Sequence, residues 1–260
     1  MKNYSLFIIC FALIFGCKNS TKDISDFPDH IDYDKIDNFM GNDVSKLSFN
    51  HLYVVLDSLS YSNFMKNNTW HETYASVDNG LPNFSAIDSN TTTCYLRGHK
   101  HYIEILGPNN RYSEPVGKSG IGFALNNHNE HFHLGIKPKL KKDSISFLSL
   151  ANTVKMNLNN KEETWFKAFY TPSEGTAIHT WYGFYNPSFL DHFNSTSHKS
   201  YSRELFLKQA YNDQKLFNGI QTITMLCTAD DFERIGQEMR YLGQKLRDRD
   251  ADTLVIAGGD

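Results

Sequence analysis

The fold is decided by a ten-residue stretch, Ser48-Phe-Asn-His-Leu-Tyr-Val-Val-Leu-Asp57. It is apolar, aromatic and β-branched, and it ends at an Asp-Ser pair that is typical of a helix N-terminus. The period-2 alternation of a strand assigns its side chains to two faces, with Phe49, His51, Tyr53 and Val55 on one and Asn50, Leu52, Val54 and Leu56 on the other. His51 therefore starts a strand that has little solvent on either face. Such a histidine is either a hydrogen-bonded core residue or a ligand, and the function depends on which.

The composition favours a folded protein with one large domain or two small ones. The chain has 260 residues, of which 40% are hydrophobic and 14% aromatic, enough to bury a sizeable core. Its net charge is −3, with neither a basic stripe nor an acidic tail. We therefore expect no nucleic-acid partner, and the sequence indicates no oligomeric state.

Residues 1–17 are predicted to be a signal segment that is not part of the fold. Lys2 precedes an uninterrupted apolar run at 6–15, which is too short to span a bilayer as a stable helix. The motif that follows, Ile-Phe-Gly-Cys17, resembles a bacterial lipobox, whose cysteine becomes the lipidated N-terminus. The alternative is an ordinary signal peptide in which Cys17 has no role.

The lipobox resemblance implies a lipoprotein held in the bacterial cell envelope through membrane lipid on Cys17. Lys18 is not the aspartate that would signal retention at the inner membrane, so the outer membrane is preferred. Residues 18–46 are polar and rich in aspartate, which predicts a tether between the lipid and the domain.

Residues 47–126 have the pattern of a β-α-β-β-β module. A helix is predicted over 58–70 after the opening strand, and a polar loop over 71–90. Three short strands follow, predicted at 91–98, 101–106 and 119–125.

This module resembles the glyoxalase and bleomycin-resistance superfamily, also called vicinal oxygen chelate proteins. The resemblance rests on Phe-Asn-His-Leu-Tyr-Val-Val-Leu-Asp at 49–57, Tyr-Leu-Arg-Gly at 95–98, Tyr-Ile-Glu-Ile-Leu at 102–106 and Gly-Ile-Gly-Phe-Ala at 120–124. Within the superfamily the chain is similar to a group of uncharacterised bacterial glyoxalase-like proteins. The resemblance implies that two modules pair to form a cupped sheet.

The end of the chain is predicted to be a partial second module, a β-α-β unit at 216–260. Phe-Asn followed by an apolar strand recurs at 217–225. A helix is predicted over 229–246 and another strand over 253–257. Two strands of the second module are then missing.

Residues 127–215 are predicted to be an insertion between the two modules. Its clearest feature is a β-hairpin at 164–185, while 144–156 suits either a helix or a strand and 202–213 suits a helix. We hypothesise that the hairpin supplies the missing sheet; the alternative is an incomplete sheet with an exposed edge. The expected fold class is α+β, with a glyoxalase-like βαβββ module and a degenerate second module.

In metal-dependent members of the superfamily, the resemblance implies one ligand from the first strand and one from the third strand of each module. His51 and Glu104 occupy these positions, and such ligands suit a divalent ion such as Fe, Mn, Ni or Zn. Gly219 stands where the second module would carry its histidine, so two of four ligands are missing. His179 in the hairpin is the best candidate for a third ligand, and Gln221 is a weaker one.

A metal-free interpretation of these two residues is also open. His51 would then hydrogen-bond Glu104 across the cavity, and Glu104 would be a buried carboxylate paired with Arg97, Lys100 or His101.

Two other features could carry metal or redox chemistry. A histidine run at 128–133 is either a second metal site or a solvated loop. Cys94 and Cys227 could form a disulfide in an oxidising envelope, although a buried free thiol is the commoner state in a predicted strand.

Two functions follow from these residues. The first is metal-free binding of a small, partly aromatic molecule in the cupped sheet, with ligand-binding residues His51, Tyr53, Tyr102, Glu104 and Trp181. The second is a divalent-metal-dependent lyase, isomerase or dioxygenase that uses His51, Glu104 and His179. The missing second-half histidine favours binding, because open catalytic sites usually keep three protein ligands. Whether the protein is an enzyme stays open.

Overall fold

The computed structural model describes residues 47–125, 150–193, 196–241, 246–249 and 253–256. The predicted signal segment and tether, and the histidine run at 128–133, lie outside these described residues. Within the described ranges, no helix is both long enough and apolar enough to cross a membrane.

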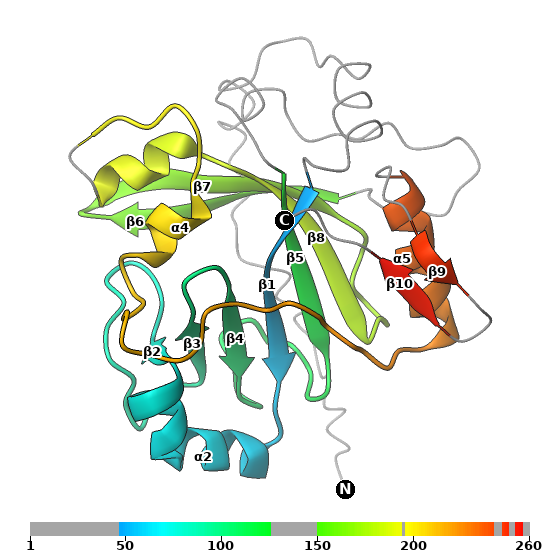
Figure 1. Cartoon of the computed structure of the whole chain (residues 1–260), viewed down its shortest axis with the longest axis horizontal. Helices are drawn as coiled ribbons and strands as arrows, with labels where there is room; N and C mark the ends of the chain where they lie inside the picture. Colours follow the sequence, from blue (N-terminus) through cyan, green and yellow to red (C-terminus); the bar gives the residue numbers. More distant parts are fainter. Residues whose placement is uncertain (1–46, 126–149, 194–195, 242–245, 250–252, 257–260) are drawn as a thin grey trace, which may run out of the picture.

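The centre of the molecule is a mixed eight-stranded sheet with the order β2-β3-β4-β1-β5-β8-β7-β6 (Figure 1). The strands are β1 (Leu47–Val55), β2 (Ser76–Asp78), β3 (Thr93–Arg97), β4 (Tyr102–Leu106), β5 (Ser119–Leu125), β6 (Leu150–Leu158), β7 (Lys161–Tyr170) and β8 (Ile178–Tyr185). The pairs β1–β4 and β5–β8 are parallel, and the other neighbouring pairs are antiparallel. The predicted α+β class is confirmed.

The opening stretch forms β1, which lies in the middle of the sheet between β4 and β5. The strand prediction is confirmed, but a β-bulge between Phe49 and His51 interrupts the alternation. The ring of Phe49 lies edge-on against His101, with ring centroids 4.9 Å apart. The bulge therefore separates Phe49 from the face to which the alternation assigned it together with His51.

The Asp-Ser pair after β1 starts a helix, as predicted. Asp57 caps α2 (Ser58–Lys66), because its carboxylate accepts the backbone N–H groups of Leu59 and Ser60 at 2.8 and 2.9 Å. The helix ends four residues before the predicted boundary, and a π-helical turn, η3 (Thr69–Tyr74), follows it. The predicted loop at 71–90 also contains β2, which extends the sheet beyond β3.

One face of the sheet is covered by α2 and by the segment around Phe217. The buried members of this core are Phe64, Ala75, Cys94, Leu96, Ile105 and Phe217. Cys94 is a buried free thiol and Cys227 is an exposed one, so they form no disulfide. Even-numbered residues of β1 and odd-numbered residues of β4 point to this face, which leaves His51 and Glu104 on the opposite one.

The predicted β-hairpin at 164–185 is confirmed as β7 and β8. Ala168 pairs with Gly183 at its centre, and β8 then runs parallel to β5. The ambiguous segment 144–156 contributes β6, which pairs with β7. The hairpin thus extends the sheet of the first module directly.

The prediction of a strand at 216–225 is wrong. Phe217 donates its backbone N–H to Tyr74, and Asn218 accepts from Lys100, so the backbone binds loops and not a neighbouring strand. Residues 221–228 form no helix or strand. Backbone groups that are satisfied in this way cannot also enter a sheet ladder.

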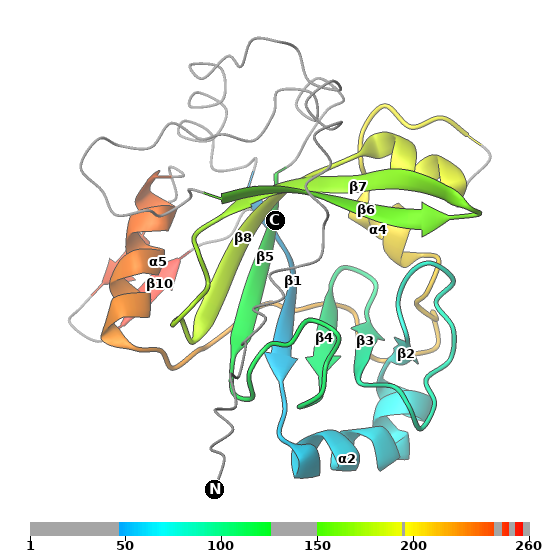
Figure 2. The same cartoon turned by 180° about the vertical axis from the view of Figure 1, so that it is seen from behind.

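The C-terminal elements lie beside the main sheet. The predicted helix is confirmed as α5 (Ala229–Tyr241), and it lies next to β8 in both views (Figures 1 and 2). A separate two-stranded sheet pairs β9 (Leu246–Arg249) with β10 (Leu254–Ile256). Leu246, predicted as the last helical residue, therefore begins a strand, and β10 confirms the strand predicted at 253–257.

Two short helices fill the region between the hairpin and the β2 end of the sheet. They are η4 (Pro187–His192), capped by Asn186, and α4 (Arg203–Leu207), capped by Ser202, which is shorter than the predicted helix at 202–213. In both views α4 lies between the β6–β7 pair and β2–β3 (Figures 1 and 2). Phe206 and Leu207 of α4 pack in a cluster with Tyr95 and Tyr102, which places α4 over the His51 side of the sheet.

Candidate functional site

The pairing register brings the predicted site residues to one face of the sheet. In one row across the strands, His51 of β1 pairs with Tyr102 of β4 and with Gly122 of β5, which pairs with Trp181 of β8. Register partners point to the same side of a sheet, so these side chains share a face.

A second row lies two residues further along. It contains Glu104, Tyr53, Gly120 and His179, in the strand order β4, β1, β5 and β8. Six of the residues proposed for ligand or metal binding therefore lie in two adjacent rows, namely His51, Tyr53, Tyr102, Glu104, His179 and Trp181. We call this surface the His51–Glu104 face.

Two glycines allow aromatic rings to lie across β5. A Cβ at Gly120 would be 2.1 Å from the Tyr53 ring, and one at Gly122 would be 2.6 Å from the indole of Trp181. The rings of Tyr53 and Trp181 consequently come within 5.8 Å of each other, nearly parallel. The sequence contained both glycines, but only the strand pairing shows why they are needed.

His51 is enclosed by aromatic rings. Its imidazole stacks on Tyr102, with centroids 4.2 Å apart and planes 12° apart, and meets Trp181 edge-on at 5.1 Å. Its Nδ1 lies 3.2 Å from Oδ1 of Asn50. Burial lowers the pKa of His51 well below its usual value, and the charges of Arg97 and Arg203 lower it further. His51 is therefore neutral at physiological pH.

Glu104 is the acidic neighbour of His51. Its Oε1 lies 3.5 Å from Nε2 of His51, and its side chain is 13% exposed. Burial raises the pKa of Glu104 to about 7, against the opposing charges of Arg97 and Arg111. A carboxyl group with this pKa can either donate or accept a hydrogen bond near neutral pH.

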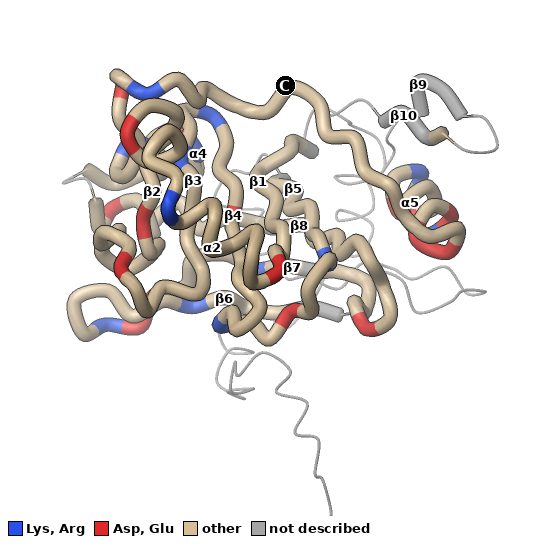
Figure 3. The backbone as a smooth tube through the Cα atoms, turned by 90° about the horizontal axis from the view of Figure 1, so that it is seen from below, with Lys and Arg blue, Asp and Glu red and all other residues tan. Residues whose placement is uncertain are grey.

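The charged neighbours of this pair come from elements other than β1, β5 and β8. Lys, Arg, Asp and Glu lie mainly on the outer elements, whereas β1, β5 and β8 are drawn without them (Figure 3). Of the three basic partners predicted for Glu104, Arg97 instead pairs with Asp78, through bonds of 2.9 and 3.1 Å. His101 accepts the backbone N–H of Ile220. The close polar contact of Glu104 is with the neutral imidazole of His51.

Arg97 forms one wall of the face. Its guanidinium carbon lies 4.5 Å from the ring centre of Tyr95 and 4.8 Å from that of Tyr102. Tyr112 closes the neighbouring side, because its hydroxyl lies 2.9 Å from that of Tyr95. No local pattern in the sequence marks Asp78 or Tyr112 as a neighbour of Glu104.

His179 lies on the same face but apart from the other two proposed metal ligands. Three strand spacings of about 4.8 Å separate β4 from β8, so the backbones of Glu104 and His179 are about 14 Å apart. Burial lowers the pKa of His179 to about 3. Across the described part of the chain, no group of three His, Cys, Asp or Glu residues is arranged to hold a metal ion.

Buried polar atoms on this face that have no hydrogen-bond partner among the described residues include the hydroxyl of Tyr102 and Nε2 of His179. Because buried polar groups are nearly always paired, such atoms indicate positions for a bound molecule or water.

The second-half residues do not contribute to this face. Gly219 lies against His101, where a Cβ would be 3.0 Å from Nδ1, and Gln221 is exposed. The interpretation of Gly219 as the missing partner of His51 is wrong, because its segment is not a strand of the sheet.

Comparisons with known proteins give a family without an assigned function. A family model described as "Family of unknown function (DUF5829)" matches residues 49–260, which include the His51–Glu104 face. No curated protein matches the chain, and no solved structure matches it.

Proposed function

The chain belongs to this family of unknown function, DUF5829, and from the geometry of the His51–Glu104 face we propose that it binds a small, flat molecule there without a metal ion. The observation that carries the proposal is a neutral histidine beside a carboxyl group with a pKa of about 7, both walled by aromatic rings. Polar groups placed in an aromatic surface orient a ligand while the rings bury it.

The available hydrogen-bonding groups define what such a ligand would carry. The Tyr102 hydroxyl can donate a hydrogen bond to a ligand, and His179 offers an unpartnered Nε2. His51 and Glu104 can each donate or accept a hydrogen bond, depending on the tautomer of the imidazole and the protonation of the carboxyl group. A flat molecule with polar groups at its edge would stack on Trp181 and satisfy these atoms. Stacking on aromatic rings adds about 0.5–1.5 kcal/mol to the burial of apolar area.

We further propose that residues 47–125 form a glyoxalase-like module. The order β1, α2, β3, β4, β5 supports this, with β2 as an addition between α2 and β3. Anchoring in the bacterial envelope through Cys17 remains part of the same proposal, and it rests on the lipobox resemblance.

Benzamide is a suitable first probe, because it is flat, neutral and carries both a donor and an acceptor. We expect calorimetric titration to detect its binding to the full chain. Tyr102→Phe should weaken that binding by about 2- to 10-fold, because one hydrogen bond is lost. Tyr182→Phe is the matched control, since its hydroxyl bonds Glu238 on the opposite face. Equal losses in the two variants, or no binding at all, would contradict the proposal.

A divalent-metal enzyme is the second candidate. Nε2 of His51 and Oε1 of Glu104 are 3.5 Å apart, close enough for both to reach one ion. Elemental analysis of the purified full chain, with His51→Ala and Glu104→Ala as variants, separates the two functions. Stoichiometric metal that both variants lose would overturn metal-free binding in favour of this alternative.

A further inference from the structure

Arg203 reaches the His51–Glu104 face from α4. Its Nη1 donates a hydrogen bond to the carbonyl oxygen of Phe49, two residues before His51 in β1. Because α4 packs against Tyr102 through Phe206, the guanidinium is held at the end of the face where β1 begins. No motif or spacing in the sequence marks this residue.

The surroundings of Arg203 are aromatic hydroxyls. Its charge opposes the effect of burial, which raises the pKa values of Tyr185 and Tyr201, and it also lowers the pKa of His51. Tyr185 is four residues after Trp181 in β8, so it points to the same side of the sheet. Burial lowers the pKa of Arg203, with these hydroxyls acting in the opposite direction.

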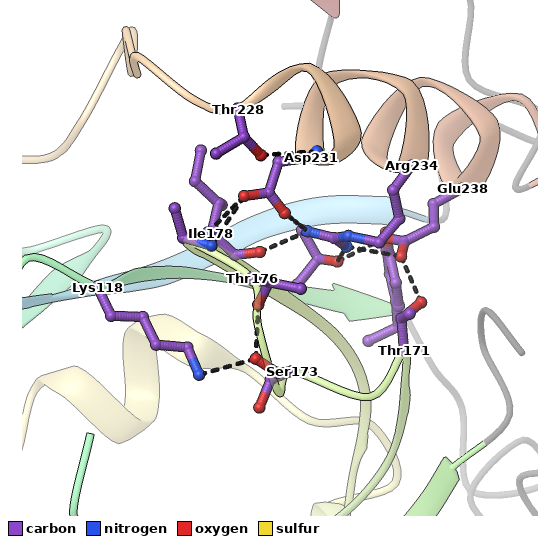
Figure 4. A network of polar contacts seen from close by, with 12 residues as sticks. Lys118, Thr171, Ser173, Thr176, Ile178, Thr228, Asp231, Arg234 and Glu238 are labelled. Carbon is purple, nitrogen blue, oxygen red and sulfur yellow. Dashed lines mark hydrogen bonds and ion pairs between the residues drawn. The ribbon is translucent and has the colours of Figure 1, made fainter. Parts of the chain in front are cut away.

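Two other arginines of this chain, Arg97 and Arg234, show how a guanidinium is neutralised by ion pairs. Arg97 binds Asp78 through two bonds. Arg234 of α5 binds Asp231 at 2.9 Å and Glu238 at 2.8 Å, in a network that also holds Thr171 and Ile178 (Figure 4). In both cases carboxylates take up the fork of the guanidinium.

Arg203 differs from these two arginines. Within the described ranges it forms no ion pair, whereas both of them do. Its Nε, like that of Arg234, is buried without a hydrogen-bond partner. Its neighbour Glu204 is exposed and acts on it only through its charge. A partly buried guanidinium without a bound anion carries a desolvation cost that no ion pair offsets.

We infer that the ligand of the His51–Glu104 face is a flat molecule with a carboxylate-type anionic group, and that Arg203 binds this group beside the Tyr102 hydroxyl. The inference rests on the proposed function and narrows its ligand class. The anion would pair the free Nε of Arg203, as Asp78 pairs the Nε of Arg97. The aromatic part of the ligand would extend towards His51 and Trp181.

The test compares benzoate with benzamide, which have the same shape and differ in charge. We expect calorimetric titration of the full chain at about pH 6, where Glu104 is largely protonated, to show benzoate binding about 10- to 100-fold more tightly. Arg203→Gln should remove this preference and leave the affinity for benzamide within about twofold. Arg203→Lys should retain part of the preference, because the charge remains but the fork is lost.

Arg240→Gln is the matched control, because Arg240 is exposed on α5, on the other side of the sheet. It should leave both affinities unchanged. Equal affinities for benzoate and benzamide in the unmodified chain would overturn the anionic ligand while leaving the proposed binding function in place. A preference for benzoate that survives Arg203→Gln would also overturn it. If neither probe binds, both proposals are overturned. The comparison of benzoate with benzamide is made on the unmodified chain, so it does not depend on the folding of any variant.

Discussion

At the scale of single residues, Glu104 is a site residue whose burial lowers the stability of the folded chain when its carboxyl group is ionised. Its carboxyl group is buried beside a neutral imidazole, and burial raises its pKa from 4.5 to about 7. A raised carboxyl pKa means that the folded chain holds the proton more tightly than the unfolded chain. The contribution to stability is therefore lost as pH rises from 4.5 to 7, and it stays lost above 7.

We predict that Glu104→Gln removes this pH dependence. Relative to the unmodified chain, the variant should gain on the order of 2–3 kcal/mol in the free energy of unfolding between pH 4.5 and 8. Urea denaturation across this range, followed by circular dichroism, measures the difference. His51 titrates in both proteins, so its contribution largely cancels in the comparison.

Glu162→Gln is the control for this prediction, because the Glu162 side chain is 68% exposed. A pH profile of Glu104→Gln that runs parallel to the unmodified profile would show that Glu104 is not buried as described.

At the scale of elements, the short edge strand β2 depends on an ion pair. Its Asp78 binds Arg97 of β3, and the two side chains are 7% and 2% exposed. Asp78 also accepts the N–H of Gly80 at 2.6 Å, which fixes the turn that follows the strand. Strand β2 has three residues, so its backbone hydrogen bonds alone contribute little to stability. The Asp78–Arg97 ion pair holds β2 against β3 and also fixes the position of Arg97 beside the site.

We predict that Asp78→Asn costs about 3–5 kcal/mol in the free energy of unfolding, because the charge of Arg97 stays buried without its partner. Chemical denaturation measures this loss. Asp213→Asn, at an exposed position, should change the value by less than about 0.5 kcal/mol. A loss of similar size in both variants would contradict a specific role for the pair.

At the scale of the whole molecule, the hairpin completes the sheet and the site together. Strand β8 covers the edge of β5, and it also supplies Trp181 and His179 to the face built on β1 and β4. The hairpin was predicted to supply the missing sheet of the second module, but β8 instead pairs with β5, more than fifty residues earlier in the chain.

We predict that a fragment ending at residue 125 does not fold as a stable monomer. It would expose the edge of β5 and the apolar side chains that face Trp181. Size-exclusion chromatography and thermal melting followed by circular dichroism test this on the fragment 47–125 and the full chain. A monomeric fragment with a cooperative melting transition would show that the first module is stable alone.

By itself the sequence determined the elements whose signals are local. The β-branched run of β1, the Asp57 cap of α2, the hairpin at 164–185 and most of α5 are each specified by residues close together in the chain. It also placed His51 and Glu104 on strands whose pairing brings them together.

Tertiary structure alone decided which strands pair, and with them the composition of the site. Periodicity does not choose a partner strand, because pairing depends on backbone hydrogen bonds and burial between distant residues. Hence the segment after Phe217, which was predicted to be a strand, binds loops, and Arg203 binds the carbonyl oxygen of Phe49 in β1. The same pairing keeps His179 on the face but about 14 Å from Glu104 along the sheet.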